Sequence, residues 1–244
     1  MAEQKKKSGK RTVVKAEGTA ATKRKIKEAP ETGNATGLRI GAVVLWLIAF
    51  ALEVLAVMIF NGNVTLSFLP LSTLAQIIAV LVLDLIFVII GSQLWKKSNH
   101  IDPASEKNKL KFWLWNNMGV IACVIAFVPF IVLALTNKDA DARLKKIASI
   151  VAIVALLIGG IASYDFNPIS EEEKAEAMAE YGDEMVYWTP FGKVYHTDLD
   201  CHSMNQTDTI TEGTVEQAIA ANRTRVCKYC ERRDEKALEG TGTE

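Results

Sequence analysis

The sequence predicts an α-helical membrane protein with four transmembrane helices and a small α+β domain near the C-terminus. Four long apolar segments occupy the middle of the 244-residue chain, and a helix needs about 20 apolar residues to cross the hydrocarbon core of a bilayer. Further on, one histidine and three cysteines follow the pattern His-x4-Cys and Cys-x2-Cys. Imidazole and thiolate in such spacing are typical of zinc sites, so the small domain is predicted to bind Zn²⁺.

The charges divide the chain into unlike segments, although the totals of 28 basic and 28 acidic residues balance. Residues 1–37 carry ten basic and four acidic side chains, whereas residues 164–244 carry eight and eighteen. Opposite excesses of this kind indicate separate parts with separate surroundings. The predicted parts are a disordered basic tail at 1–37, a four-span transmembrane domain at 38–163, an acidic linker helix at 164–184, a zinc-binding module at 185–233 and a disordered tail at 234–244.

The N-terminal tail is rich in Lys, Ala, Thr and Gly and has almost no large apolar residue. Such a segment buries too little apolar surface to offset its conformational entropy, which is why disorder is expected. The first apolar run begins at Leu38 and is long enough to span a bilayer. It is therefore interpreted as an anchor and not as a cleaved signal peptide.

The apolar segments give four spans with short polar connections. They are residues 38–60, 68–95, 110–136 and 146–163. The second and third are long enough to tilt in the bilayer, and the fourth is the shortest.

The loops indicate the orientation, because cytoplasmic loops carry an excess of Lys and Arg. The basic tail precedes the first span and the second loop, KKSNHIDPASEKNKLK, holds five lysines, whereas the first loop, NGNVTLS, holds none. Both termini are thus predicted to face the cytoplasm of a plasma (inner) membrane, with Trp95, Trp113 and Trp115 at the cytoplasmic headgroups. One loop disagrees: the third, expected outside, carries Lys138, Arg143, Lys145 and Lys146.

Two acidic residues, Glu53 and Asp84, lie well inside the spans. A charge at that depth costs about 2.5–3.5 kcal/mol or more unless it is shielded, so both should face the bundle interior beside small-residue seams. Helical rise places Glu53 near the depth of Gln76, and Asp84 near Asn116 and Asn117. These residues form either a proton or ion path or a set of interhelical hydrogen bonds. The second interpretation is favoured, because no basic partner and no repeated half accompany them.

The module after the spans shows short, locally coded elements. Ser170 with Glu173 forms a capping-box pattern that starts the linker helix. The run MVYWTPFGKVYH predicts a β-hairpin whose second strand ends at His196, and Cys201 follows in a turn. Thr214 begins the helix TVEQAIAANRT, after which the final cysteine pair appears.

The predicted metal ligands are His196, Cys201, Cys227 and Cys230. Four protein ligands leave no open position, and a module of this size has a small core, so the site is predicted to be structural rather than catalytic. Two alternatives remain for the cysteines, a Cys-x-x-Cys redox pair and a disulfide. His202 is a less favoured fourth ligand than His196, because it adjoins Cys201.

The motifs GKVYHTDLDCHSM and EQAIAANRTRVCKYC resemble a small bacterial zinc-binding module of the form Gly-Lys-x-Tyr-His-x4-Cys, Ala-rich helix, Cys-x2-Cys. That module is an appendage of various bacterial proteins, secreted nucleases among them, and is distantly similar to the metal-binding domain of the Ada DNA-repair methyltransferase. The resemblance covers residues 191–231 and implies a bacterial origin and a His/Cys3 zinc site. The Ada pattern begins with a cysteine where this chain has His196, so methyl acceptance does not carry over.

Three classes of function follow. The leading one is a membrane protein whose cytosolic zinc module binds an unknown protein partner or has a structural role, and the second is transport through the Glu53/Asp84 interior with zinc-linked regulation. The third is membrane tethering of nucleic acid, which the acidic excess of the C-terminal segment disfavours. An enzyme is the least favoured class, since the sequence shows no catalytic set. Candidate contacts to an anion or partner are Arg223, Arg225, Lys228, Arg232 and Arg233.

Overall fold

The computed structural model describes residues 11–13 and 24–241. The chain forms two compact units. The helical unit comprises Asn34–Asn99 and Ala104–Phe166, and the mixed unit comprises His100–Pro103, Asn167–Glu244 and the N-terminal residues up to Gly33.

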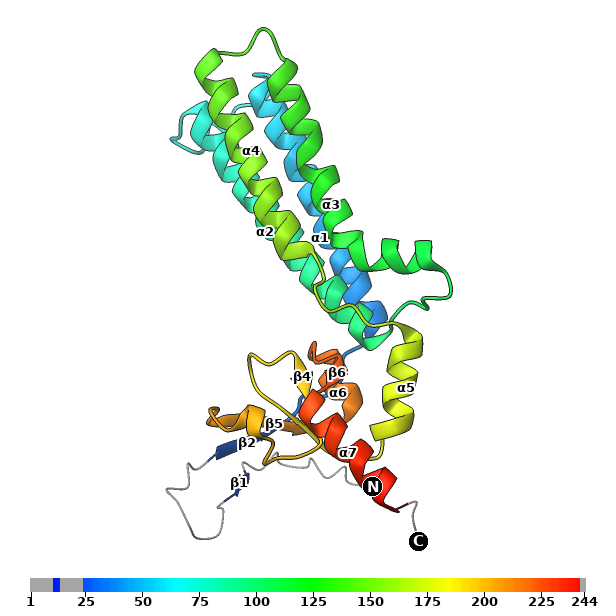
Figure 1. Ribbon diagram of the computed structural model, residues 1–244. Coiled ribbons are helices and arrows are strands. Elements are labelled where there is room, and N and C mark those ends of the chain that lie inside the picture. The colour runs from blue at the N-terminus through cyan, green and yellow to red at the C-terminus, as the bar shows by residue number, and fades with distance from the viewer. Residues whose placement is uncertain (1–10, 14–23, 242–244) are drawn as a thin grey trace, which may run out of the picture. The chain divides into compact units, whose positions relative to one another are not determined.

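The helical unit is a bundle of four long helices (Figure 1). All four are long and apolar enough to cross a membrane, which indicates a membrane protein and agrees with the predicted number of spans. Their bounds are α1 Ala35–Phe60, α2 Thr73–Ile101, α3 Lys109–Thr136 and α4 Ala142–Ser163.

Polar caps extend these helices beyond their apolar stretches. The side chains of Asn34, Asn108 and Asp141 accept hydrogen bonds from the first backbone N–H groups of α1, α3 and α4. A cap satisfies donors that have no partner within the helix. The helices α1 and α4 therefore begin a few residues before the apolar runs from which the spans were predicted.

The predicted small residues lie in the interior of the bundle, together with large apolar ones such as Phe127 and Phe130. On α1 and α3 the small residues include Ala49, Ala56, Cys123 and Ala126, all buried. A Cβ atom placed on Gly159 of α4 would lie only 2.7 Å from the Cys123 sulfur. The small side chains thus let α3 and α4 approach closely, which is a principal source of helix association in lipid. The buried small residues of α4 are Ala148, Ser149, Ala152, Ala155, Gly159 and Ser163.

The first turns of α3 run at an angle to the rest of that helix (Figure 1). Near the start of α3, the Trp115 carbonyl oxygen accepts hydrogen bonds from Trp95 Nε1 at 2.8 Å and from Asn99 Nδ2 at 2.9 Å, both on α2. These bonds tie the first turns of α3 to the end of α2.

The mixed unit contains two small sheets with helices beside them (Figure 1). The larger sheet has the strand order β1-β2-β5-β3, and the smaller pairs β4 with β6. Strand β2 lies parallel to β5, with Ile26 opposite Ile210. The element bounds are β1 Arg11–Val13, β2 Arg24–Glu28, α5 Glu171–Tyr181, β3 Val186–Trp188, β4 Val194–Tyr195, β5 Thr209–Gly213, α6 Val215–Ala220, β6 Arg225–Val226 and α7 Lys228–Thr241, with a 3-10 turn, η1, at His202–Met204.

Local sequence signals in this unit are confirmed. Ser170 and Glu173 form a reciprocal capping box at the start of α5, and Gly182 ends that helix. Thr214 and Gln217 form a second capping box at the start of α6. Each box satisfies two otherwise unpaired backbone donors, which explains why these short helices form where the sequence places them.

The structure differs from the sequence prediction at both predicted tails. Residues 24–28 form β2 within the described part of the predicted tail, because Ile26 is buried against the sheet and β5 offers an open edge. Residues 11–13 of the predicted tail form β1, and residues 1–10 and 14–23 lie outside the described residues. At the other end α7 continues through the predicted tail to Thr241, consistent with the strong helix formers Glu, Lys, Ala and Leu.

The predicted hairpin is reduced to a single antiparallel bridge between Tyr187 and His196. The two residues exchange backbone hydrogen bonds of 2.8 and 2.7 Å. Beyond this bridge the strands separate, because β3 joins β5 in one sheet and β4 joins β6 in the other. The strand β5 was not predicted from its sequence, TITEG, which carries only one large apolar residue.

Candidate metal centre

Two of the four predicted ligands follow neighbouring strands. His196 comes directly after β4 and Cys227 directly after β6, and these strands are parallel partners. The Cys227 backbone N–H donates to the Tyr195 carbonyl oxygen at 2.8 Å, which extends the pairing to the ligand itself. The sheet thus brings together residues 31 positions apart in the chain.

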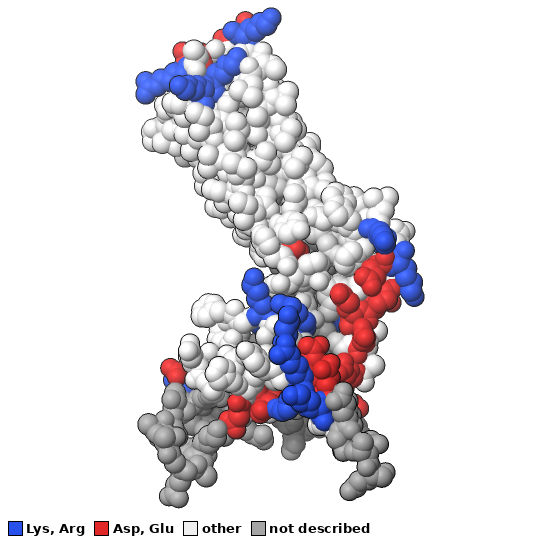
Figure 2. All heavy atoms as spheres, viewed as in Figure 1, with Lys and Arg blue, Asp and Glu red and all other residues white. Residues whose placement is uncertain are grey.

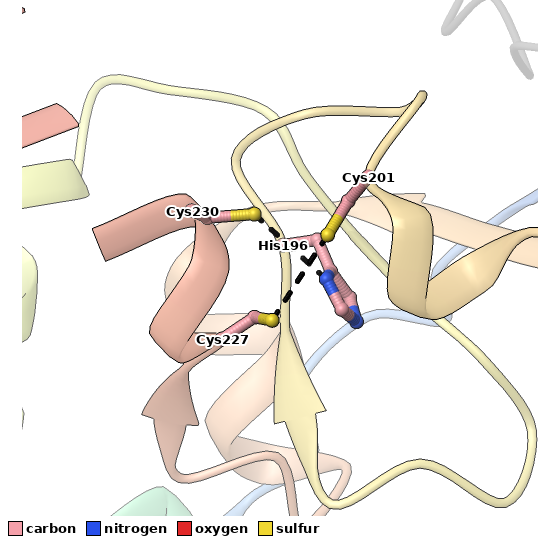
Figure 3. Close-up of side chains that lie close together, drawn as sticks. All are labelled: His196, Cys201, Cys227 and Cys230. Atoms are coloured by element: carbon pink, nitrogen blue, oxygen red, sulfur yellow. Dashed lines mark hydrogen bonds between the residues drawn. The ribbon is translucent and has the colours of Figure 1, made fainter. Parts of the chain in front are cut away.

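The other two ligands belong to short turns. Cys201 is the residue before η1, and its backbone N–H donates to the Asp198 carbonyl oxygen at 3.2 Å. Cys230 lies in the first turn of α7. Figure 3 shows the four side chains converging on one point from the strand ends, the turn and the helix.

The ligand atoms have the spacing of a tetrahedral site. The three Sγ atoms and an imidazole nitrogen of His196 all lie within 4.8 Å of one another. Cys201 Sγ is 4.0 Å from Cys227 Sγ, and Cys230 Sγ is 3.8 Å from His196 Nδ1. A tetrahedron with metal–sulfur distances of about 2.3 Å has edges of about 3.8 Å. The group could therefore hold one metal ion with little movement.

The same distances argue against the disulfide alternative. All the cysteines are free thiols, and the 4.0 Å between the sulfurs of Cys201 and Cys227 is about twice the length of an S–S bond. The four ligand residues are also buried, with exposed fractions of 2–6%. Burial limits access to a second thiol or disulfide, which a redox pair requires.

At His196 and Cys227 the electrostatics favour the protonation states that a metal ion needs. Burial lowers the pKa of His196, against the opposing effect of Asp198, and so favours the neutral imidazole that can donate a lone pair. Burial raises the pKa of Cys227, but the backbone N–H groups of Tyr229 and Cys230 together with the Ser203 and Cys201 side chains outweigh it, and the net pKa is lowered.

Cys201 shows the opposite behaviour, because burial raises its pKa to about 11. A thiol at this position holds its proton until a cation replaces it. A bound metal ion is the natural replacement, since it deprotonates a coordinating thiol outright. Metal binding at the centre is therefore expected to release protons.

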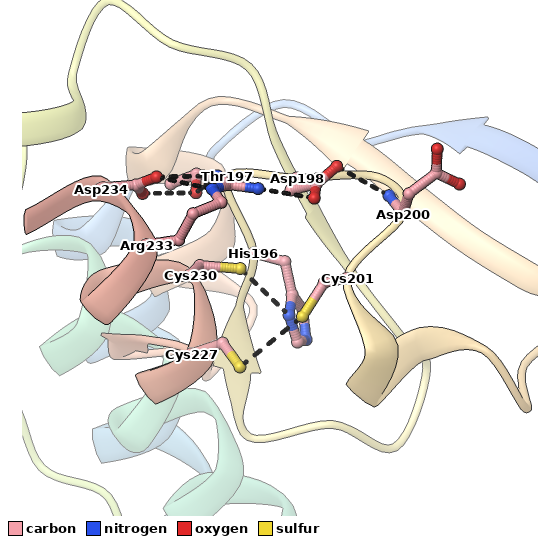
Figure 4. A network of polar contacts seen from close by, with 9 residues as sticks. All are labelled: His196, Thr197, Asp198, Asp200, Cys201, Cys227, Cys230, Arg233 and Asp234. Carbon is pink, nitrogen blue, oxygen red and sulfur yellow. Dashed lines mark hydrogen bonds and ion pairs between the residues drawn. The ribbon is translucent and has the colours of Figure 1, made fainter. Parts of the chain in front are cut away.

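A polar network holds the loop between His196 and Cys201 against α7 (Figure 4). Arg233 Nη1 lies 2.5 Å from Asp198 Oδ2, and its Nη2 donates to Thr197 Oγ1 at 3.0 Å. The Thr197 hydroxyl donates to Asp234 Oδ2 at 2.7 Å. This network was not predicted from the sequence, because Thr197 and Asp234 are 37 residues apart and only the fold brings them together.

The five basic residues predicted to contact an anion or partner do not behave alike. Arg233 is engaged in the network above, and Arg223 Nη2 donates to the backbone carbonyls of Thr189 and Pro190 at 2.9 and 2.6 Å. These two side chains thus stabilise the unit itself. The other three are exposed: Arg225, Lys228 and Arg232.

The interior acids of the bundle have different surroundings. Glu53 Oε1 accepts a hydrogen bond of 2.9 Å from the backbone N–H of Phe130, the residue after Pro129. Proline disrupts the helical hydrogen bonding around it, and Glu53 thus supports α3 at that point. Asp84 is fully buried, and neither of its carboxyl oxygens has a hydrogen-bond partner within the described residues.

The other predicted interior polar residues bind nearby backbone and do not pair with the acids. Gln76 bonds Leu66 and Leu71 in the loop between α1 and α2, with its Oε1 accepting from the Leu66 N–H at 3.0 Å. Asn116 and Asn117 donate to carbonyls one turn earlier in α3. Gln76, Asn116 and Asn117 thus satisfy their polar groups locally and not through the two acids.

The arrangement can bind a metal ion through one imidazole and three thiolates, with each ligand fixed by a strand end, a turn or a helix start. All four positions of a tetrahedron are filled by protein, so such an ion would hold the fold together. Comparisons of the chain with models of protein families, with curated proteins and with solved structures give no match.

Proposed function

We propose that this chain is a plasma-membrane protein whose mixed unit folds around one Zn²⁺ and serves as a recognition module for a protein partner. The observation that carries the proposal is the buried convergence of His196, Cys201, Cys227 and Cys230. A small unit with a metal at its centre uses the binding free energy of the ion as folding free energy.

Zinc is the metal that the donor set favours. Three thiolates and one imidazole in a tetrahedron suit Zn²⁺, whereas Mg²⁺ and Ca²⁺ require oxygen ligands. The Cys227–Cys230 spacing and the four-coordinate geometry match structural zinc sites. Reduced thiolates persist in the cytosol, which supports a cytoplasmic location of the mixed unit.

Exposed apolar side chains of the mixed unit support a protein partner. Phe191, in the turn between β3 and β4, is 98% exposed, and Tyr229, between two ligands, is 63% exposed. Aromatic residues are enriched at protein interfaces. Nucleic acid is the weaker candidate, because Arg223 and Arg233 bond their own unit and the C-terminal segment carries eighteen acidic residues against eight basic ones.

The test is metal analysis of the full-length protein, purified in detergent without added zinc. We expect one Zn²⁺ per chain, and we expect a strong chelator to make the mixed unit sensitive to protease while the helical unit keeps its helicity. A chain that is free of metal yet equally resistant to protease would overturn the proposal. The partner role is tested separately, by comparing partner binding of the wild type with that of Phe191→Ser. This substitution leaves the four metal ligands intact.

A second candidate function rests on Asp84. A buried carboxyl with no described hydrogen-bond partner in a membrane-spanning helix is unusual, and such residues mark proton relays in transporters. Proton flux into liposomes that contain the protein tests this candidate. Flux that is lost in Asp84→Asn but retained in Asn117→Asp would support transport, and equal background leakage in all samples would exclude it.

A further inference from the structure

A groove opens on the helical unit where α1, α2 and α3 meet. Its volume is about 330 Å³, and the side chains that line it are all apolar. Val88 and Trp95 of α2 are buried at its floor, whereas Leu47 and Phe50 of α1 are exposed at its rim. All of these residues belong to helices that are long and apolar enough to span a membrane, and the apolar lining suits hydrocarbon better than water.

A second cavity lies beside the bend of α3. Its volume is about 260 Å³, and its lining includes Asn108, Lys111, Trp115 and Met118. Met118 lines both this pocket and the apolar groove, so the two cavities lie on either side of one side chain. An apolar groove and a pocket with polar and cationic groups are thus neighbours on the same unit.

The pocket carries a positive charge at Lys111, whose Nζ lies 6.0 Å from the centroid of the Trp115 ring. The Arg39 guanidinium carbon lies 5.7 Å from the same ring, outside the lining of the pocket. The described residues place no carboxylate within ion-pair distance of Lys111, and none lines either cavity. A pocket of this composition attracts an anion.

The surroundings of the pocket are those of a membrane interface. Leu110 and Trp113 on the first turns of α3 are 69% and 57% exposed. Three exposed lysines, at positions 107, 109 and 111, lie beside them in the chain. Tryptophan and lysine side chains are enriched at the level of the lipid headgroups. The residues around the pocket therefore suit a lipid headgroup, and the residues that line the groove suit an acyl chain.

We propose that this groove and pocket form a specific binding site for an anionic phospholipid. One acyl chain lies in the groove between α1 and α3, with its methylenes against Ala122 and Ala126, and the phosphate lies beside Lys111 and Trp115. A lipid fits better than a helix of a second copy, because a single molecule of lipid supplies both hydrocarbon for the groove and negative charge for the pocket. The site is independent of the metal centre, since all its residues lie in the helical unit.

Native mass spectrometry of the full-length protein tests the proposal, with phosphatidylglycerol and phosphatidylcholine offered in equal amounts. We expect one phosphatidylglycerol molecule to be retained preferentially. Lys111→Gln should reduce that preference about fivefold, the effect of one basic residue near an anionic headgroup. The matched control is Lys109→Gln, which removes the same charge outside the lining and should change the preference less.

The groove has its own pair of variants. Ala122→Phe fills the groove and should lower retention of both lipids, whereas Val124→Phe adds the same ring to the exposed side of α3, outside the lining, and should not. Thermal unfolding in detergent checks that each variant is folded. If Ala122→Phe does not fold, Lys111→Gln still tests the proposal. Equal retention of the two lipids by the wild type, or a dimer that binds no lipid and is disrupted by Ala122→Phe, would overturn the proposal.

Discussion

Each of the four residues of the candidate metal centre is positioned by a different part of the backbone. Cys227 is fixed by the β4–β6 pairing through its own backbone N–H, and Cys230 by the first turn of α7. His196 is fixed through its backbone exchange with Tyr187. Cys201 depends on a turn that the Arg233 network secures only indirectly. The site is thus rigid on three sides before any ion binds.

The first prediction is that Cys227→Ser abolishes stoichiometric zinc binding, because it removes one thiolate of four. Loss of one ligand forfeits several kcal/mol of a binding free energy of about 10–16 kcal/mol, and the mixed unit should then unfold in the full-length protein. The zinc content per chain and protease sensitivity measure both effects.

The matched control is His202→Ala. His202 is exposed, with its ring 6.3 Å from that of Tyr229, and its removal should leave one zinc per chain. Zinc that is lost from His202→Ala and kept by His196→Ala would show that the wrong histidine has been assigned.

The sequence predicted which four side chains converge, because their spacing is a local property of two short stretches of chain. It could not predict the support around them. Thr197, Asp198, Arg233 and Asp234 are ordinary surface residue types, and their role depends on the distance between the His196–Cys201 loop and α7. For the same reason the partner of Glu53 was missed: it is a backbone N–H, which side-chain patterns do not reveal.

At the scale of elements, the contact between α3 and α4 depends on glycine at one position and not at its neighbour. A Cβ atom on Gly159 would lie 2.7 Å from Cys123 Sγ and 3.0 Å from Leu85 Cδ1, whereas one on Gly160 would meet no atom within 4 Å. Adjacent positions on one helix thus offer a matched pair with the same chemical change.

We predict that Gly159→Ala destabilises the bundle by about 1–3 kcal/mol through overpacking. Gly160→Ala should be neutral or stabilising by up to about 1 kcal/mol, because alanine favours helix over glycine. Unfolding in mixed micelles measures both. Adding Cys123→Ala to Gly159→Ala should recover part of the loss, and no recovery would mean that the strain does not arise at the sulfur.

The strand β2 was missed from sequence because its pattern, RKIKE, contains one apolar residue among four charges. What makes it a strand is the open edge of β5, more than 180 residues further along the chain. Its neighbour Ala29 also packs 2.6 Å from the position that a Cβ on Gly213 would occupy, so only glycine fits there. Tertiary context thus overrides a local composition typical of disorder.

The next prediction concerns this strand. Ile26 is 5% exposed, and Ile26→Ala should lower the stability of the mixed unit by about 2 kcal/mol or more, since buried apolar side chains cost that much to truncate. Lys27→Ala, an exposed change on the same strand, should have an effect within about 0.5 kcal/mol. Denaturant unfolding of the zinc-loaded protein compares the two. Equal effects would show that β2 does not belong to the folded unit.

At the scale of the whole molecule, an even number of spans places both ends of the bundle's chain on one side of the membrane. The basic residues of the second and third loops give opposite indications of which side this is. Figure 2 shows basic side chains gathered at the end of the bundle that holds the α3–α4 connection, where Lys138, Arg143, Lys145 and Lys146 lie. Acidic Asp139 and Asp141 lie among them, but acidic residues weigh little in the orientation of membrane proteins.

The opposite end of the helical unit carries the stronger signal. The second loop and the start of α3 hold three exposed lysines at 107, 109 and 111, beside the exposed Trp113. The basic residues of the N-terminal tail enter before α1, on this same side. Because early segments usually dominate the orientation, we expect this end in the cytoplasm despite the basic third loop.

The last prediction tests that orientation with single introduced cysteines. In intact cells, a membrane-impermeant thiol reagent should label Asn63→Cys and Asp139→Cys, which are exposed in the first and third loops. It should spare Glu106→Cys in the second loop until the cells are permeabilised. Cys123→Ala provides the background, and the three cysteines of the metal centre stay buried. The reverse labelling pattern would contradict the prediction, because it would place the third-loop lysines in the cytoplasm and the mixed unit outside it. The thiolates of the metal centre would then have to persist in an oxidising compartment.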